Sequence, residues 1–211
     1  MRTLRHGILI SDTERTLKVI QITSAKPAEG KTAMALAMVI SAPRGMRRLI
    51  IDGDVRRGSV SHFFELTSKK GLVDVLTEAT SLQEAIHVDA NTGVHVMPAG
   101  TRNPNAPDLL SPDKLDRLIA AVRSNYDIVV IDSAPLGSVV DAVVISRIVD
   151  TTILVVKWAS TPRELVEAAL NRLPARAHVC GVVLNHMNER RARRYGPIYE
   201  GSYQHRSYFQ T

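Results

Sequence analysis

The sequence predicts an α/β protein built on a mostly parallel β-sheet with helices on both faces. Short runs rich in Val and Ile alternate along the chain with longer amphipathic stretches. The short runs are continuously apolar instead of alternating with a period of two, which is typical of strands buried on both faces. Alternating strands and helices form an open sheet with right-handed crossovers, whose ligand site lies at the carboxyl ends of the strands.

Six predicted strands alternate with predicted helices along the chain. The predicted strands cover residues 18–23, 48–52, 93–98, 127–132, 151–157 and 178–185. The predicted helices cover residues 31–42, 59–66, 71–77 with 81–87, 111–124, 138–147 and 162–173. The helix after Ser111 has the clearest start, since Ser is a good N-cap and Pro112 fits the first helical position.

Composition limits the class of protein. The chain has 211 residues, of which 45% are hydrophobic and 23% charged, enough for one globular domain with a sizeable core. Its longest uncharged apolar stretch, residues 33–42, is about half of what a bilayer crossing needs, and no signal segment opens the chain. We therefore expect a soluble domain. The single Cys180 excludes a disulfide framework and fits a buried strand thiol in a reducing cytoplasm.

The C-terminal segment differs from the rest of the chain. From Glu189 onward, five arginines against two glutamates give +3, half of the formal net charge of +6. The segment also holds four of the five tyrosines, Tyr195, Tyr199, Tyr203 and Tyr208, without the apolar periodicity that would bury them. We predict a domain over 1–188 and a flexible basic tail over 189–211. No basic helix with interleaved aromatics occurs in the domain, so no nucleic-acid partner is expected.

The first predicted strand leads into SAKPAEGKT, residues 24–32, a tight loop ahead of a helix. Such a loop presents backbone N–H groups to phosphate oxygens, while Lys31 reaches the β and γ phosphates and Thr32 offers its hydroxyl to Mg²⁺. The loop departs from the strict phosphate-loop pattern, because Ala25 and Ala28 stand where related loops have glycine. On this segment alone, a chance Gly-Lys-Thr after an apolar run is the alternative.

Three aspartates follow the ends of predicted strands. Asp52 and Asp54 end the second strand, and Asp132 ends the strand over 127–132. The carboxyl ends of parallel strands share one edge of the sheet, and Mg²⁺ prefers such hard oxygen ligands beside a nucleotide. A single strand-end aspartate is often a turn former, but three beside a Lys-Thr loop favour nucleotide binding.

These motifs together resemble the bacterial tyrosine kinases of exopolysaccharide and capsule synthesis, within the deviant Walker class of P-loop ATPases. The resemblance covers nearly the whole chain, through TSAKPAEGKT, LIIDGDVRRGSVSHFF, NPNAPDLL, YDIVVIDSAPLGSVVDA, GVVLN and the tyrosine tail, which sister ATPases lack. It implies an autokinase that uses ATP and Mg²⁺, releases ADP, and regulates polysaccharide polymerisation and export. Its expected place is the cytoplasm, at the inner face of the bacterial inner membrane.

The same resemblance implies a role for individual residues. Asp52 would take the proton of the acceptor tyrosine, while Thr32, Asp54 and Asp132 would hold Mg²⁺. Nucleotide contacts would come from the loop and the start of the helix, through Lys26, Ala28, Glu29, Gly30, Lys31, Thr32 and Ala33. The phosphoryl acceptors would be Tyr195, Tyr199, Tyr203 and Tyr208, reached in trans within an oligomer.

The N-terminal segment RTLRHGI, residues 2–8, resembles an interface segment of the family. Arg2 and Arg5 would be its arginines, which implies a homo-oligomer such as a ring. A membrane polysaccharide co-polymerase is the other partner that the resemblance implies.

Two departures from the family pattern keep a second class of function open. Ala28 replaces a glycine common in the family's loop, which matters if the position needs positive φ. Lys26 stands at the extra signature lysine of the chromosome-partitioning and division-site ATPases. These residues favour the alternative of an assembly ATPase, a nucleotide switch without kinase activity.

Overall fold

The computed structural model describes residues 17–103, 111–188 and 190. In this part of the chain one sheet has seven strands in the order β3-β4-β2-β5-β1-β6-β7. The strands are β1 (Val19–Ser24), β2 (Arg48–Gly53), β3 (His87–Val88), β4 (His95–Met97), β5 (Ile128–Ser133), β6 (Thr151–Lys157) and β7 (Val179–Asn185). Neighbouring strands are parallel except for β3 and β4.

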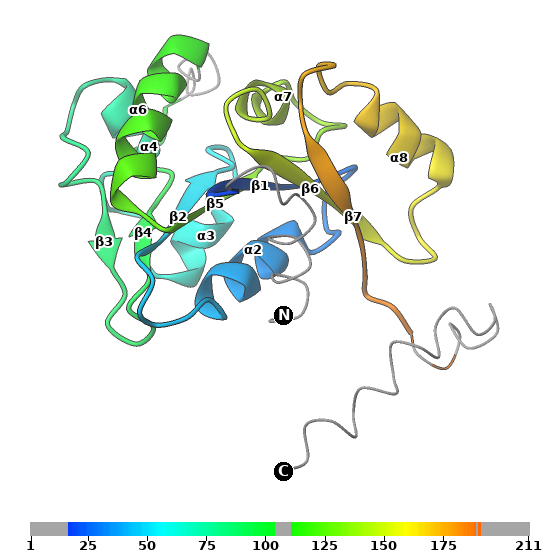
Figure 1. Cartoon of the computed structure of the whole chain (residues 1–211), viewed down its shortest axis with the longest axis horizontal. Helices are drawn as coiled ribbons and strands as arrows, with labels where there is room; N and C mark the ends of the chain where they lie inside the picture. Colours follow the sequence, from blue (N-terminus) through cyan, green and yellow to red (C-terminus); the bar gives the residue numbers. More distant parts are fainter. Residues whose placement is uncertain (1–16, 104–110, 189, 191–211) are drawn as a thin grey trace.

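Helices cover both faces of this sheet, as Figure 1 shows. They are α2 (Lys31–Ile40), α3 (Ser59–Phe63), α4 (Leu72–Leu76), α6 (Pro112–Asn125), α7 (Asp141–Ile145) and α8 (Arg163–Leu170). The helices α2 and α3 pack on one face, and α4, α6, α7 and α8 pack on the other. The predicted fold class, a mostly parallel sheet between two helical layers, is confirmed.

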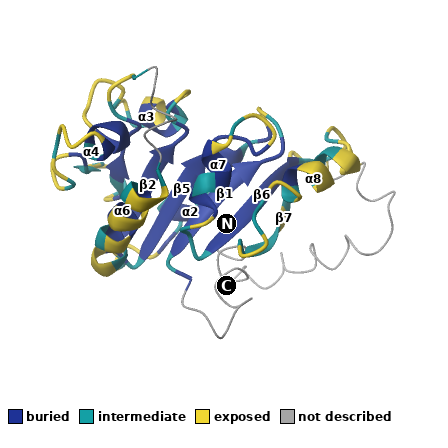
Figure 2. Ribbon diagram, turned by 90° about the horizontal axis from the view of Figure 1, so that it is seen from above, coloured by how far each residue is buried: buried dark blue, intermediate teal, exposed yellow. Residues whose placement is uncertain are grey.

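Alternate residues of the central strands face opposite layers. Ile20 and Ile22 of β1 pack with Met38 of α2, whereas Val19 packs with Leu118 of α6. All of these side chains are buried, and Figure 2 shows the central strands of the sheet as a buried layer. Burying both faces explains why the strand sequences are continuously apolar.

The helix predicted over residues 81–87 is wrong. This segment forms hydrogen-bonded turns, with the Ala85 N–H bonded to the Ser81 carbonyl at 3.2 Å, and then the short strand β3. His87 and Val88 pair with β4 in antiparallel register. That pairing takes the backbone groups that another helical turn would have used.

The last predicted strand is not buried on both faces. Strand β7 is at one end of the strand order, and Val182 and Leu184 are exposed. Cys180 of β7 is therefore only half-buried, although burial still raises the pKa of its thiol. A continuously apolar run does not distinguish a central strand from a strand at the end of the sheet.

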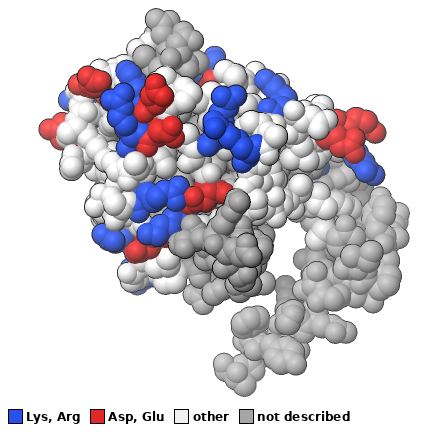
Figure 3. Space-filling view, turned by 45° about the horizontal axis from the view of Figure 1, so that its top comes forward, with Lys and Arg blue, Asp and Glu red and all other residues white. Residues whose placement is uncertain are grey.

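The surface is polar and mixed in charge. On the face shown in Figure 3, Lys and Arg side chains are interspersed with Asp and Glu side chains. No described helix is long and apolar enough to cross a membrane. Arg2, Arg5 and the four tail tyrosines, with nearly all of the predicted tail, lie outside the described residues.

Candidate active site

The carboxyl edge of the sheet brings the predicted loop and aspartates together. Strand β5 lies between β1 and β2, so Asp132 is in register with Ile22 on one side and with Asp52 on the other. Two residues after Ile22, β1 ends at Ser24 and the phosphate loop begins. Segments far apart in the sequence therefore meet because of strand order.

Two residues of the phosphate loop have a left-handed backbone, which is costly for the one that is not glycine. Ala28 has φ of 63° and Gly30 has φ of 89°, so the position that departs from the family's glycine does need positive φ. For a residue with a Cβ this region costs about 1 kcal/mol or more. At Gly30 there is also a steric reason for glycine, since a Cβ there would lie 2.1 Å from Asn185 Nδ2.

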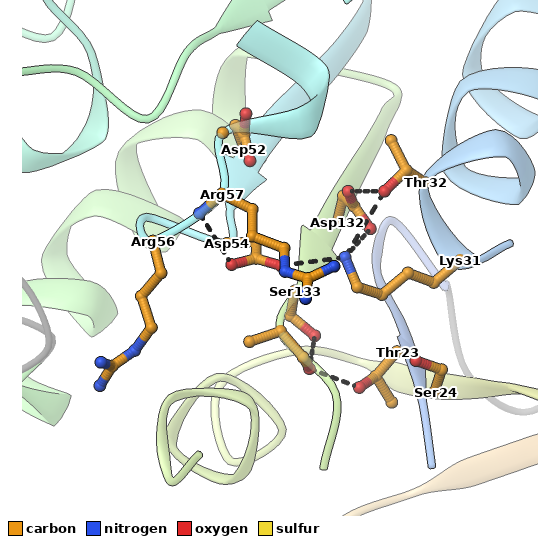
Figure 4. Close-up of polar contacts among 12 residues, drawn as sticks. Thr23, Ser24, Lys31, Thr32, Asp52, Asp54, Arg56, Arg57, Asp132 and Ser133 are labelled. Atoms are coloured by element: carbon orange, nitrogen blue, oxygen red, sulfur yellow. Dashed lines mark hydrogen bonds and ion pairs between the residues drawn. The ribbon is translucent and has the colours of Figure 1, made fainter. Parts of the chain in front are cut away.

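Lys31 and Thr32, at the start of α2, contact the carboxylates directly, as Figure 4 shows. The Lys31 ammonium lies 3.1 Å from Asp54 Oδ2 and 3.6 Å from Asp132 Oδ1. The Thr32 hydroxyl donates a hydrogen bond of 2.6 Å to Asp132 Oδ2. Lys31 and both aspartates are buried, so the three charges form one compact network.

Asp132 of this network has a raised pKa. Its burial raises the pKa to about 7, against the opposing effects of the Lys31 charge and the Thr32 hydrogen bond. Its Oδ1 has no hydrogen-bond partner in the described part of the chain. A hydroxyl and two carboxylates, one with an oxygen that accepts no hydrogen bond from the described residues, are a donor set that fits Mg²⁺.

Asp52 is equally buried but has a different environment. Its Oδ2 accepts hydrogen bonds from the Ser61 N–H at 2.8 Å and the Ser61 hydroxyl at 2.7 Å, while Oδ1 has no partner among the described residues. Burial raises the pKa of Asp52, although the two bonds from Ser61 oppose that effect. The sequence analysis missed Ser61, because a serine in a short helix gives no signal of its partner.

Glu29 has a structural role that the sequence did not indicate. Its buried carboxylate accepts hydrogen bonds from the Lys26 N–H at 2.9 Å, the Lys157 N–H at 3.1 Å and the Thr161 hydroxyl. The Asn185 side chain donates to the Glu29 carbonyl at 2.9 Å. We call these contacts the Glu29 clamp; they fix the phosphate loop to the ends of β6 and β7.

The remaining predicted nucleotide contacts lie at the rim of the loop. The Lys26 ammonium donates to the Ser160 carbonyl at 3.1 Å, and Ala33 is exposed on the first turn of α2. The charged groups of Glu29 and Lys26 thus form hydrogen bonds with other residues of the protein.

Comparison with known proteins agrees with this geometry. A family model described as an AAA domain matches residues 17–172. The putative tyrosine-protein kinase CapB of Staphylococcus aureus is 32% identical over 188 residues, which cover 88% of this chain and 82% of CapB. The succinoglycan biosynthesis transport protein ExoP of Rhizobium meliloti is 35% identical over 179 residues, which cover 82% of this chain but 23% of ExoP. The solved kinase domain of Escherichia coli tyrosine kinase ETK superposes with a TM-score of 0.85 at 29% identity, covering 90% of this chain and 75% of that one.

The fold and the loop define a P-loop protein of the AAA domain family. Within it, the chain belongs to the bacterial tyrosine kinases, whose members function in capsule and exopolysaccharide synthesis. The family resemblance of the motifs is thereby confirmed.

Proposed function

We propose that this chain transfers the γ-phosphoryl group of ATP to the tyrosines of its own C-terminal tail. The observation that carries the proposal is the meeting of two groups at one sheet edge. One is the Lys31 network, formed by Lys31, Thr32, Asp54 and Asp132; the other is the buried Asp52, whose Oδ1 accepts no hydrogen bond from the described residues. The first group is suited to binding a nucleotide, and the second is suited to accepting a proton.

The nucleotide would bind at the start of α2. The backbone N–H groups of a loop with left-handed residues, followed by a helix N-terminus, favour phosphate. Lys31 would exchange its bonds to Asp54 and Asp132 for the phosphate oxygens and so stabilise negative charge during transfer. Thr32, Asp54 and Asp132 would hold Mg²⁺, which neutralises phosphate charge when bound.

Asp52 would act on the acceptor. The tyrosine hydroxyl has a pKa of about 10, so it needs a base at neutral pH. The hydroxyl oxygen forms the new bond to phosphorus, the bond from the γ phosphorus to the ADP oxygen breaks, and the proton moves to Asp52 Oδ1. The raised pKa of Asp52 makes it a stronger base than an ordinary aspartate.

The test is mass spectrometry of tail peptides after incubating the full chain with Mg-ATP. Phosphate on Tyr195, Tyr199, Tyr203 or Tyr208 in the wild type, and none in Lys31→Met, is the expected result. Circular dichroism of the variant checks that its fold is intact. ATP consumption with an unmodified tail would reject the kinase in favour of the assembly ATPase, in which Lys26 acts across a dimer.

We further propose that transfer occurs in trans within a homo-oligomer, with Arg2 and Arg5 at its interface. Relation to ExoP, a transport protein more than four times as long as its matched part, supports a membrane polysaccharide co-polymerase as partner at the inner face of the bacterial membrane. The trans step is tested by mixing two variants. One is Lys31→Met with its tail tyrosines intact, and the other keeps Lys31 but has phenylalanine in place of the four tail tyrosines. Phosphate on the Lys31→Met tail is expected, and an unmodified tail would show transfer in cis.

A further inference from the structure

A hollow lined by arginines lies beside Asp52, on the side of the site where the acceptor tyrosine would bind. It has a volume of about 300 Å³ and is walled by Arg56, Arg57 and Gly58 after Asp54, by Ser61 of α3, and by Arg102 after β4. Among the described residues, no aspartate or glutamate lines it. We call it the arginine hollow.

Residues that line the arginine hollow also form hydrogen bonds with Asp52 and Asp54. The Ser61 hydroxyl, which lines it, donates to Asp52 Oδ2 at 2.7 Å. The Gly58 N–H, from the same wall, donates to the Asp54 carbonyl at 2.8 Å. A group bound in the hollow therefore lies next to the aspartate that would accept the tyrosine proton.

The three arginines differ in their partners. Arg56 Nε lies 3.5 Å from Asp141 Oδ2, a buried carboxylate, and Figure 4 shows its side chain pointing away from the Lys31 network. Arg57 and Arg102 have no ion-pair partner within the described part of the chain. The wall of the hollow thus includes two arginines without an ion-pair partner among the described residues. The backbone beside Arg102 is held in place, because the Thr101 N–H donates to Asp74 Oδ2 at 2.9 Å.

We propose that the arginine hollow binds a phosphotyrosine already formed in the tail. A phosphorylated tyrosine carries about −1.5 to −2 charges and three acceptor oxygens, which the planar guanidinium recognises in bidentate fashion. An unphosphorylated tyrosine offers no anion to these arginines. This inference rests on the proposed function and adds a second binding site to it.

The spacing of the tail tyrosines suits this arrangement. Tyr195, Tyr199 and Tyr203 are four residues apart, and Tyr208 follows five residues later. Four extended residues span about 14 Å, enough to place the next tyrosine at Asp52 while the phosphotyrosine stays in the adjoining hollow. The first phosphorylation then makes the tail a better substrate for the next.

Binding is tested first, without any need for catalysis. The full chain, with its four tail tyrosines replaced by phenylalanine, is titrated against labelled peptides of residues 193–211, with or without phosphate on Tyr203, by fluorescence anisotropy. We expect the phosphopeptide to bind about tenfold tighter or more, and this preference to fall below about twofold in R57Q/R102Q, because charge-assisted bonds are lost. R117Q, which changes an exposed arginine on α6, should keep the preference.

Competition identifies the site. Inorganic phosphate should displace the phosphopeptide, and Mg-ADP should leave it bound. Equal binding of the two peptides, displacement by Mg-ADP, or a full preference in R57Q/R102Q would each overturn the proposal.

A kinetic arm links the site to the reaction. With Mg-ATP and the wild-type chain, kcat/KM at Tyr199 should be about tenfold higher in the peptide phosphorylated at Tyr203 than in the Tyr203→Phe peptide, since a bound phosphate holds the acceptor in place. The ratio of the two values is the readout, and it should approach one in R57Q/R102Q. An unchanged ratio in that variant would reject ordered phosphorylation. If no tyrosine is modified at all, the proposed function fails, while the anisotropy result still decides the anion site.

Discussion

The nucleotide side and the acceptor side of the site hold their charges in different ways. On the nucleotide side, Lys31 is paired with two buried carboxylates. On the acceptor side, Arg57 and Arg102 line a hollow whose described residues include no carboxylate. A ligand must exchange existing ion pairs on the first side, whereas it adds new ones on the second. Substitutions can therefore be directed at one side or the other.

The largest effect is expected from Asp52→Asn, which changes a residue of the acceptor side. Removing a general base lowers the rate of transfer by about 10²–10⁴-fold. Nucleotide affinity should stay within about threefold, because the hydrogen bonds of Asp52 go to Ser61 and it acts on Lys31 only through its charge. Single-turnover phosphotyrosine formation and Mg-ADP titration measure the two quantities. A wild-type rate in the variant would remove Asp52 from the mechanism.

Glu29→Gln should disturb the nucleotide side, because it weakens the hydrogen bonds of the Glu29 clamp. Losing the charge of a buried acceptor of three hydrogen bonds should cost about 1–3 kcal/mol of unfolding free energy and weaken nucleotide binding. Glu164→Gln, at an exposed position of α8, is the matched control and should change both quantities little. Urea denaturation and Mg-ADP titration provide the measurements. Equal effects of the two variants would contradict the clamp.

The raised pKa of Asp132 gives a pH dependence on the nucleotide side. The folded state holds this proton up to about pH 7, whereas an unfolded chain loses it near 3.8. Between these values the unfolded state binds fewer protons, so the unfolding free energy falls as pH rises. In nucleotide-free, EDTA-treated protein, Asp132→Asn should reduce this fall. Parallel pH profiles of wild type and variant would refute the assignment.

The smallest effect concerns the backbone of the phosphate loop. Ala28→Gly should raise the unfolding free energy by about 0.5–1 kcal/mol, because glycine adopts the φ of 63° without strain. Ala33→Gly, in the first turn of α2, should lower it by about 1 kcal/mol. Thermal unfolding of both variants checks the opposite signs. Destabilisation by both would show that Ala28 is not strained.

The sequence predicted what depends on local pattern and on strand-end geometry. Continuous apolar runs located six of the strands, and the carboxyl-edge rule brought Asp52, Asp54 and Asp132 to the loop. It did not predict contacts between polar residues far apart in the chain. Asn185 reaches Glu29 across 156 positions, and neither residue type specifies the other. The short strand β3 was missed because two residues are too few for a periodic signal.

The contact between Asn185 and the phosphate loop has a mechanical consequence. Asn185 ends β7, and the predicted tail begins only four positions later. The strand that leads to the tyrosines is thus bonded to the carbonyl of Glu29 and fills the space beside Gly30. Tension on the tail, as when a neighbouring chain binds it, would be transmitted through β7 to the backbone that would bind phosphate. Pulling on the acceptor segment would therefore weaken nucleotide binding by the same chain.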